Sequence, residues 1–241
     1  MTDRSPLYRL GGASAMAGAV LGLVANLLHP RTRDILSTET QLRMAAESGF
    51  WILDHLAILL ATLLITGGLV ALARSVREPA AAAWARLGLA AALVSAALSS
   101  VLWALDGIVL REVALAWAAA AGGEKTALSA AAHVLRQTNL ALLAVWTIVY
   151  FGITTMLYGA ALARSAAYPG WLGRVALGAG LASLLVGLTL ALTGPSHLVS
   201  NVLFAALSLL VTAWTFVAGL YLRRRATVSN PAAGPARIAT T

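Results

Sequence analysis

The sequence predicts an all-α integral membrane protein, a bundle of six transmembrane helices with both termini in the cytoplasm. Composition, the spacing of apolar stretches and the distribution of basic residues lead to this prediction. Of the 241 residues, 60% are hydrophobic and 11% are charged, and the mean hydropathy is +0.83. A soluble domain has roughly 25% charged residues, and a soluble chain of this composition would expose a large apolar surface. Lipid is therefore the solvent that suits the chain.

Six apolar stretches have the length of about 20 residues that a spanning helix needs. They cover residues 10–28, 50–73, 87–110, 138–163, 171–193 and 198–222. The first stretch runs to His29-Pro30 without a convincing cleavage site, so we interpret it as a retained helix and not a signal peptide. Residues 1–225 are expected to form one transmembrane domain. Residues 226–241 have two prolines and no apolar run, which predicts a disordered cytoplasmic tail.

Two connections between the stretches show helical patterns of their own. Thr38-Glu39-Thr40-Gln41 is a capping-box pattern, and it predicts a short surface helix through Ala46. Residues 111–137 are rich in alanine and are interrupted by Gly122-Gly123. We therefore expect the third and fourth helices to continue past the bilayer as a hairpin that turns at these glycines.

The basic residues predict the orientation, because short cytoplasmic loops hold an excess of arginine and lysine. With the N-terminus inside, the cytoplasmic side has eleven basic and two acidic residues (net +9), and the other side has six and seven (net −1). The overall charge of +8 is thus a topology signal and an anchor for anionic lipid headgroups. Nothing further supports nucleic-acid binding. A bacterial cytoplasmic membrane is the expected location, as an arginine- and alanine-rich composition fits a GC-rich genome.

The rare polar residues of the stretches gather at the extracytoplasmic side, which all four histidines share. An ionisable residue at the centre of a spanning helix costs roughly 2.5–3.5 kcal/mol, so each one requires a reason. Helical spacing places several of these residues on common faces, where lipid would leave them unsatisfied. The predicted pocket consists of Trp51, Asp54, Ser99, Trp103, Asp106, Arg136, Asn139, Trp146 and Asn201.

Histidine and carboxylate groups together suit zinc, copper or iron, and paired histidines can hold a haem. His55 and His133 are the first candidate ligand pair, with Asp54 and Asp106 as further ligands or their hydrogen-bond partners. His29 and His197, which lie next to helix-ending prolines, come after them. Two other interpretations stay open. An Asp–His array can transfer protons, and ion pairs of Arg136 with Asp106 or Glu112 can simply clamp the third and fourth helices.

The sequence leaves three function classes open. The first is a binding or sensing protein for a metal, haem or small ligand; the second is a membrane enzyme using Asp54, His55 and Asp106; the third is a structural or accessory subunit without a site. A small transporter is a fourth, disfavoured by the scarcity of charge at the bilayer centre. Absence of cysteine excludes disulfides and thiolate sites, and no H-E-x-x-H, G-x-S-x-G or P-loop motif is present. Lipids, a second copy or another membrane protein are the expected partners.

Overall fold

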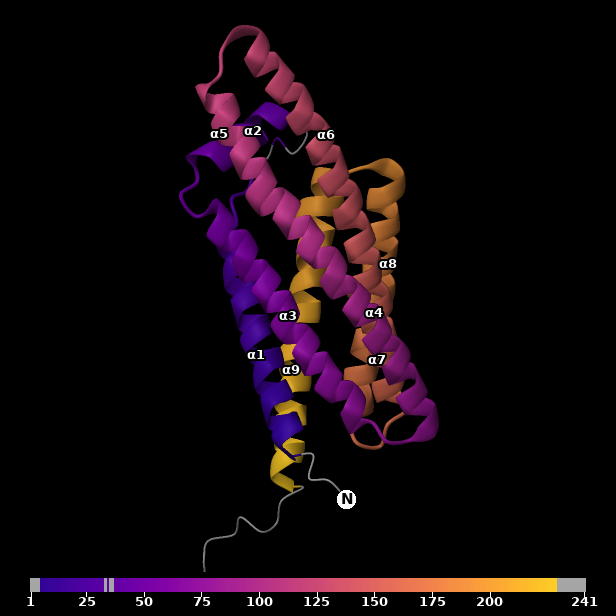
Figure 1. Ribbon diagram of the computed structural model, residues 1–241. Helices are drawn as coiled ribbons and strands as arrows, with labels where there is room; N and C mark the ends of the chain where they lie inside the picture. Colours follow the sequence, from indigo (N-terminus) through magenta and orange to yellow (C-terminus); the bar gives the residue numbers. More distant parts are fainter. Residues whose placement is uncertain (1–4, 33, 35–36, 229–241) are drawn as a thin grey trace, which may run out of the picture.

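The computed structural model describes residues 5–32, 34 and 37–228, and these residues form helices joined by short connections (Figure 1). Six helical spans are long and apolar enough to cross a membrane: Ser5–Leu28, Trp51–Ser75, Pro79–Ala119, Gly122–Ala163, Gly170–Thr193 and His197–Thr227. This result confirms the all-helical class and the six apolar helices. Each span covers most of the stretch predicted for it, and the third and fourth are longer than the apolar part alone.

The spans are built from the following elements. The first two are α1 (Ser5–Leu28) and α3 (Trp51–Ser75), with the short α2 (Thr38–Glu47) between them. The third consists of α4 (Pro79–Trp103), the π-helical segment η1 (Ala104–Val109) and α5 (Leu110–Ala119). The fourth consists of α6 (Gly122–Trp146), the π-helical η2 (Thr147–Thr154) and α7 (Thr155–Ala163). Then follow α8 (Gly170–Thr193), the π-helical η3 (His197–Leu203) and α9 (Phe204–Val228).

Local chemistry accounts for the helix boundaries. Pro79 occupies the first turn of α4, where its missing N–H leaves no bond unmade. Gly122 has a φ of +56°, a left-handed conformation that makes the sharp turn from α5 into α6, so the predicted hairpin at Gly122-Gly123 is confirmed. The predicted surface helix is α2, but its N-cap is Ser37, whose side chain accepts a hydrogen bond from the Thr40 N–H. The N-cap is therefore one residue earlier than the capping-box pattern indicated.

The C-terminal boundary differs from the prediction. α9 continues to Val228, so the first three residues of the predicted tail are helical. Thr227 Oγ1 donates to the Arg224 carbonyl and satisfies one acceptor of this last turn. The remainder of the predicted tail, residues 229–241, lies outside the described residues.

Glycines allow α1 to pack closely between α3 and α9. A Cβ at Gly12 would lie 2.7 Å from the Gly219 carbonyl oxygen, and one at Gly18 would lie 2.8 Å from the Ala61 carbonyl oxygen. Backbones this close exclude any larger residue. On the other side of α3, the chain packs α4 against η2 and α7, and α7 lies along α8. α3 is thus a central helix of the bundle.

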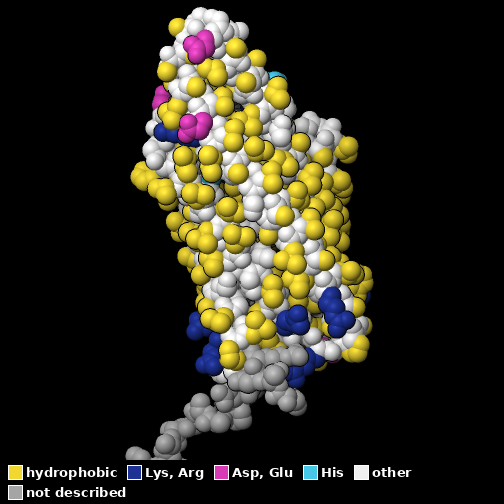
Figure 2. Space-filling model, viewed as in Figure 1, with side chains coloured by type: hydrophobic (Ala, Val, Ile, Leu, Met, Phe, Trp, Pro, Cys, Tyr) yellow, Lys and Arg dark blue, Asp and Glu magenta, His cyan; other side chains and the backbone are white. Residues whose placement is uncertain are grey.

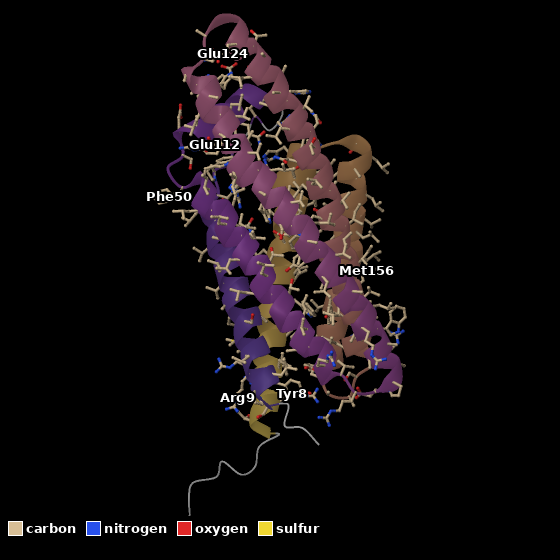
Figure 3. The ribbon with its side chains drawn as sticks, viewed as in Figure 1. Tyr8, Arg9, Phe50, Glu112, Glu124 and Met156 are labelled. Atoms are coloured by element: carbon tan, nitrogen blue, oxygen red, sulfur yellow. The ribbon has the colours of Figure 1, made fainter. Side chains whose placement is uncertain are left out.

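The two ends of the bundle differ in chemistry. We call one the arginine end; its exposed side chains are Arg9, Arg74, Arg77, Arg86, Arg164, Arg174, Arg223 and Arg224. Figure 2 shows basic side chains gathered there, an apolar surface between the ends, and acidic side chains at the opposite end. We call this opposite end the histidine end. Figure 3 places Tyr8 and Arg9 at the first end and Glu112 and Glu124 at the second.

The histidine end is covered by a small helical cap. α2 packs against α5 and α6, and the α5–α6 hairpin projects beyond the other helices (Figure 1). The cap has its own apolar core of Leu42, Ala45, Trp51, Leu110, Ala114, Trp117 and Ala132. Trp51 belongs both to this core and to the first turn of α3, where the candidate site begins.

Candidate functional site

His29 and Asp54 form the first part of the site. His29 directly follows α1, and Asp54 lies in the first turn of α3. The connection between these helices returns the chain to the same end of the bundle, so the end of one helix meets the start of the next. His29 Nδ1 lies 2.5 Å from Asp54 Oδ2, and the Asp54 side chain is only 5% exposed. A hydrogen must lie between these atoms, because a carboxylate oxygen can only accept.

His55 is the most deeply buried member of the site, with 1% of its side chain exposed. Its Nδ1 lies 2.6 Å from the backbone oxygen of Trp51, so Nδ1 carries a hydrogen and donates it. In a neutral ring, Nε2 then presents a lone pair, and this atom lies 3.3 Å from Asp106 Oδ2. Two facing lone pairs repel each other. A shared proton or a metal ion between Nε2 and the carboxylate removes the repulsion.

Asp106 reaches His55 because its helix is locally widened. It lies in η1, and π-helical insertions of this kind are frequent at functional sites. The Trp51 indole donates to the Asp106 backbone oxygen at 2.8 Å. Asn139 Nδ2 donates to the second carboxylate oxygen of Asp106 at 3.1 Å. The backbone and the side chain of Asp106 are therefore both held in place.

Gly107, the next residue of η1, makes room for the histidine. A Cβ at this position would lie 2.5 Å from the Cβ and 2.9 Å from the Cγ of His55. No real side chain tolerates such distances without movement of its neighbour. The absence of a side chain at Gly107 therefore permits the close crossing of α3 and η1 that brings His55 to Asp106.

The resulting cluster has a ligand set suited to a cation. One ligand atom from each of His29, Asp54 and His55 can be chosen so that all three lie within 4.8 Å of one another. Nitrogen and oxygen donors of this type suit zinc, copper and iron. Each ring also donates from Nδ1, His29 to a carboxylate and His55 to a backbone oxygen. Metal-binding histidines are typically oriented in this way, which leaves Nε2 free to coordinate.

Aromatic rings enclose the cluster on the side of the bundle centre. The His55 ring lies 4.8 Å from Trp51 and 5.7 Å from Trp103, measured between ring centroids. Trp103 in turn contacts Trp146 at 5.6 Å, and Trp146 stacks on Tyr150. The indole N–H groups of Trp103 and Trp146 are buried and have no hydrogen-bond partner among the described residues. Buried donors without a protein partner are usually satisfied by a bound water or a ligand.

The structure brings together much of the predicted pocket and places His29 beside His55. Trp51, Asp54, His55, Trp103, Asp106, Asn139 and Trp146 are connected through the contacts described above. His133 is exposed on α6, where its Nδ1 lies 3.3 Å from Thr38 Oγ1. Among the described residues, the group that could hold an ion contains His29, Asp54 and His55, and His133 is not part of it. His133 lies instead on the part of α6 that packs with α2 in the cap.

The other predicted residues occupy separate positions. His197 is exposed at the start of η3, and Asn201 is half-buried in the same segment. Ser99 and Arg136 are buried, and the Ser99 hydroxyl has no partner among the described residues. Sequence reasoning ranked His29 too low and did not identify Gly107. The position of His29 beside Asp54 could have been predicted from chain order, because consecutive antiparallel helices place the end of the first beside the start of the second.

Comparison of this chain with protein-family models, with curated proteins and with solved structures finds no match.

Proposed function

We propose that this chain is a multi-pass membrane protein that binds a divalent transition-metal ion in the His29–Asp54–His55 cluster. Six apolar spans and leucines as exposed as Leu28 (74%) and Leu192 (83%) support insertion into lipid. The arginine end then faces the cytoplasm together with both termini, and the histidine end lies at the other side of the cytoplasmic membrane. Anionic headgroups are the natural partners of the exposed arginines.

The convergence of the half-buried His29 with the buried Asp54 and His55 is the observation that supports metal binding. The distance of 3.3 Å between His55 Nε2 and Asp106 Oδ2 also fits two ligands of one metal ion. Two ligands of a tetrahedral zinc ion, each about 2.0–2.1 Å from the metal, lie about 3.3 Å apart. Asp106 is therefore suited to complete the set. The ion would supply the positive charge that the contact between His55 Nε2 and Asp106 requires.

A metal ion suits the cluster better than a haem does. The His29 and His55 rings meet edge to face with their centroids 5.2 Å apart. Both rings also contact Trp51, at 6.0 and 4.8 Å. A macrocycle held between two axial histidines would have to separate these rings completely. The packing therefore favours a bare ion with compact coordination.

Metal titration of the purified protein tests the proposal, and the four histidines provide matched variants. Protein in mild detergent is stripped with a chelator, then titrated with Co²⁺ as a spectroscopic probe and with Zn²⁺ by calorimetry. We expect one ion per chain, and we expect His29→Ala and His55→Ala to weaken binding by more than about 100-fold, the upper end for loss of a supporting partner alone. His133→Ala and His197→Ala, both exposed in the structure, should bind like the parent protein. Equal binding by all four variants would show that the cluster only joins α1, α3 and η1.

A further inference from the structure

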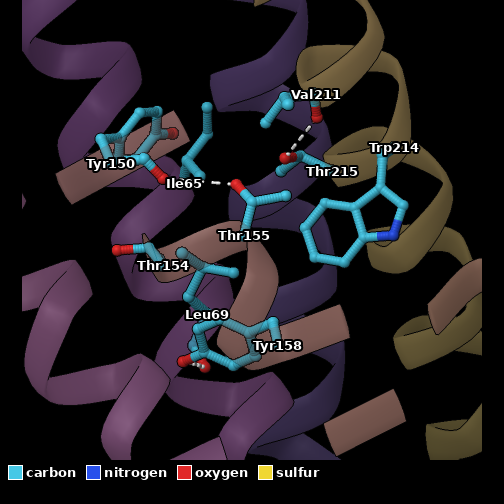
Figure 4. A pocket seen from close by; sticks show the side chains of 9 residues that line it. All are labelled: Ile65, Leu69, Tyr150, Thr154, Thr155, Tyr158, Val211, Trp214 and Thr215. Carbon is cyan, nitrogen blue, oxygen red and sulfur yellow. Dashed lines mark hydrogen bonds between the residues drawn. The ribbon is translucent and has the colours of Figure 1, made fainter. Parts of the chain in front are cut away.

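Two adjacent cavities lie at the centre of the bundle between α3, α9 and the η2–α7 helix. The larger is about 40 Å³ and the smaller, shown in Figure 4, is about 10 Å³. Both are lined by Ile65, Tyr150, Val211 and Thr215, so they meet at these residues. The larger cavity also touches α1 at Gly22 and Asn26, and it opens at the surface there, because Asn26 is exposed. A water molecule needs roughly 10–15 Å³ measured in this way, so the space suits a few waters and nothing larger.

The larger cavity begins about one helical turn below the His/Asp cluster. Its lining residue Asn26 lies three positions before His29, whose N–H still bonds to Ala25 in the last turn of α1, and Ile58 follows Asp54 by four positions in α3. Three or four residues span one turn, so each pair shares a helix face. The cavity therefore lies on the same face as the cluster, on its side toward the bundle centre. Trp146 belongs both to the cavity wall and to the aromatic rings near His55.

The cavity walls offer hydrogen-bond acceptors and no charge. Thr62, Thr155 and Thr215 donate their hydroxyl hydrogens to carbonyl oxygens of their own helices, at 3.0, 3.3 and 2.9 Å. Their oxygen lone pairs remain available to the cavity. Within the part of the chain that the structure describes, no Asp, Glu, Lys or Arg lines either space. Water is the ligand that hydroxyl acceptors in a small neutral cavity select.

Tyr150 and Trp146 supply the donors that such waters need. The Tyr150 side chain is 6% exposed and borders both cavities. The Trp146 indole N–H, at the wall of the larger cavity, is buried and has no hydrogen-bond partner among the described residues, whereas the buried hydroxyl of Tyr158 donates to the Leu69 carbonyl at 2.8 Å. A bound water removes the cost of such an unpartnered buried donor.

The file of hydroxyls ends at Tyr158. Leu72, Leu162 and Leu172 are each at most 2% exposed and belong with Tyr158 to the main apolar core. None of the three lines either cavity, so the space ends before it reaches them. Among the described residues, hydroxyl side chains thus line both cavities, and the space ends before the leucines of the core.

We propose that the two cavities form a blind, water-filled chamber that reaches from the His/Asp cluster to Tyr158. Water enters from the histidine end, hydrates Tyr150 and the threonines, and stops before the leucines of the core. This inference does not depend on metal binding, since it rests on the cavity, its hydroxyls and Tyr150. It gives the bundle an aqueous recess that extends to about the middle of the apolar span while the opposite half remains dry.

Single cysteines in this cysteine-free chain can test the chamber. A thiol reacts as its thiolate, which forms in contact with water and not in a dry core. Thr215→Cys places the thiol in the chamber, and Ala179→Cys places it in the dry α8 interface; both parent residues are 3% exposed. The full-length protein, in detergent and in vesicles, is treated with Ag⁺, then denatured and labelled with N-ethylmaleimide. Mass spectrometry measures the thiols that Ag⁺ has blocked.

We expect Ag⁺ to block Thr215→Cys at least about tenfold faster than Ala179→Cys, because only the first thiol meets water. Thr212→Cys, at the wall of the larger cavity, should react like Thr215→Cys and guards against misfolding of one variant. Adding Gly22→Leu should slow both reactions, since a Cβ there meets only Ala61 Cβ at 3.4 Å and the side chain can fill the space. Equal, slow reaction of all three thiols overturns the chamber. Metal binding that survives His29→Ala and His55→Ala overturns the proposed function and leaves this result unaffected.

Discussion

The two ends of the bundle hold different charged groups in opposite environments. At the arginine end, most guanidinium groups are exposed, and Arg164 lies over Trp84 and Arg224 over Tyr221, while the half-buried Arg225 lies over Tyr168. At the histidine end, Asp54 and His55 are buried and paired. Exposed charges are solvated and contribute little individually to stability. Buried charges lose their hydration and must be compensated by partners. The histidine end is therefore where the chain contains charged groups that cost folding free energy.

Glu78 makes the contrast clear, because it is an acid at the arginine end with a purely local role. Its carboxylate accepts hydrogen bonds from the Ser165 hydroxyl and the Ala166 N–H, both at 3.0 Å. These bonds fix the α7–α8 connection next to the start of α4. The pKa of Glu78 is lowered from its ordinary 4.5, first by its own backbone N–H and then by Ser165. The Glu78 carboxylate is solvated, and its hydrogen bonds join the α3–α4 connection to the α7–α8 connection without forming a binding site.

The largest expected effect comes from breaking the buried cluster. His55→Ala removes a partner of Asp106 and the ring that packs on Gly107. Breaking a buried charged pair costs about 3–5 kcal/mol, because the remaining carboxylate loses its compensation. Thermal unfolding in detergent should show this loss. His197→Ala at the exposed start of η3 is the control, with a change within about 0.5 kcal/mol. Comparable losses for both variants would remove the distinction between buried and exposed histidines.

The second effect tests whether Gly107 determines the position of His55. In Gly107→Ala, the new methyl group overlaps His55, so the two helices must separate. Overpacking of this kind costs about 1–3 kcal/mol, and metal affinity should fall with it. Gly123→Ala is the matched control, since its Cβ would meet nothing within 4 Å. The interpretation fails if Gly107→Ala unfolds and binds metal like Gly123→Ala.

A third pair of variants sharpens the assignment of the two carboxylates. If Asp106 coordinates the ion through the Nε2 side of His55, Asp106→Asn should weaken metal binding by more than about 100-fold. Asp54→Asn should then weaken it by about 10–100-fold, the range for a group that orients a ligand. Calorimetric titration of both variants gives the ranking. The reverse order would make Asp54, and not Asp106, the carboxylate that coordinates the ion.

The smallest effect concerns Glu78 at the arginine end. Because its pKa is lowered in the folded protein, the ionised form stabilises the fold, and this contribution is fully present above the unfolded pKa. It is lost as the pH falls through the lower, folded pKa. Unfolding temperatures measured from pH 6 downward should therefore decrease below about pH 4.5 less steeply in Glu78→Gln than in the parent chain. Identical pH profiles would show that the bonds to Ser165 and Ala166 do not depend on the charge.

The sequence by itself determined the helical class, the six apolar spans and the gathering of polar residues at one end. These properties are local: hydropathy over about 20 residues, and the conformation that Gly122 permits, do not depend on which helices are neighbours. Chain order also contains part of the site. α1 and α3 are consecutive, so the proximity of His29 to Asp54 follows from topology once the short connection is recognised.

Only the tertiary structure decided which helix faces meet. Lipid is as apolar as leucine, so hydropathy does not specify the neighbour of each helix, and close contacts at small residues such as Gly107 and Gly12 do. The π-helical η1 changes the direction of Asp106 in a way that regular helical spacing cannot anticipate. His133 is a suitable ligand type and lies at the histidine end, but it is exposed on the part of α6 that projects beyond the other helices (Figure 1). Helix length and packing determine this position, and neither can be read from the periodicity of the sequence.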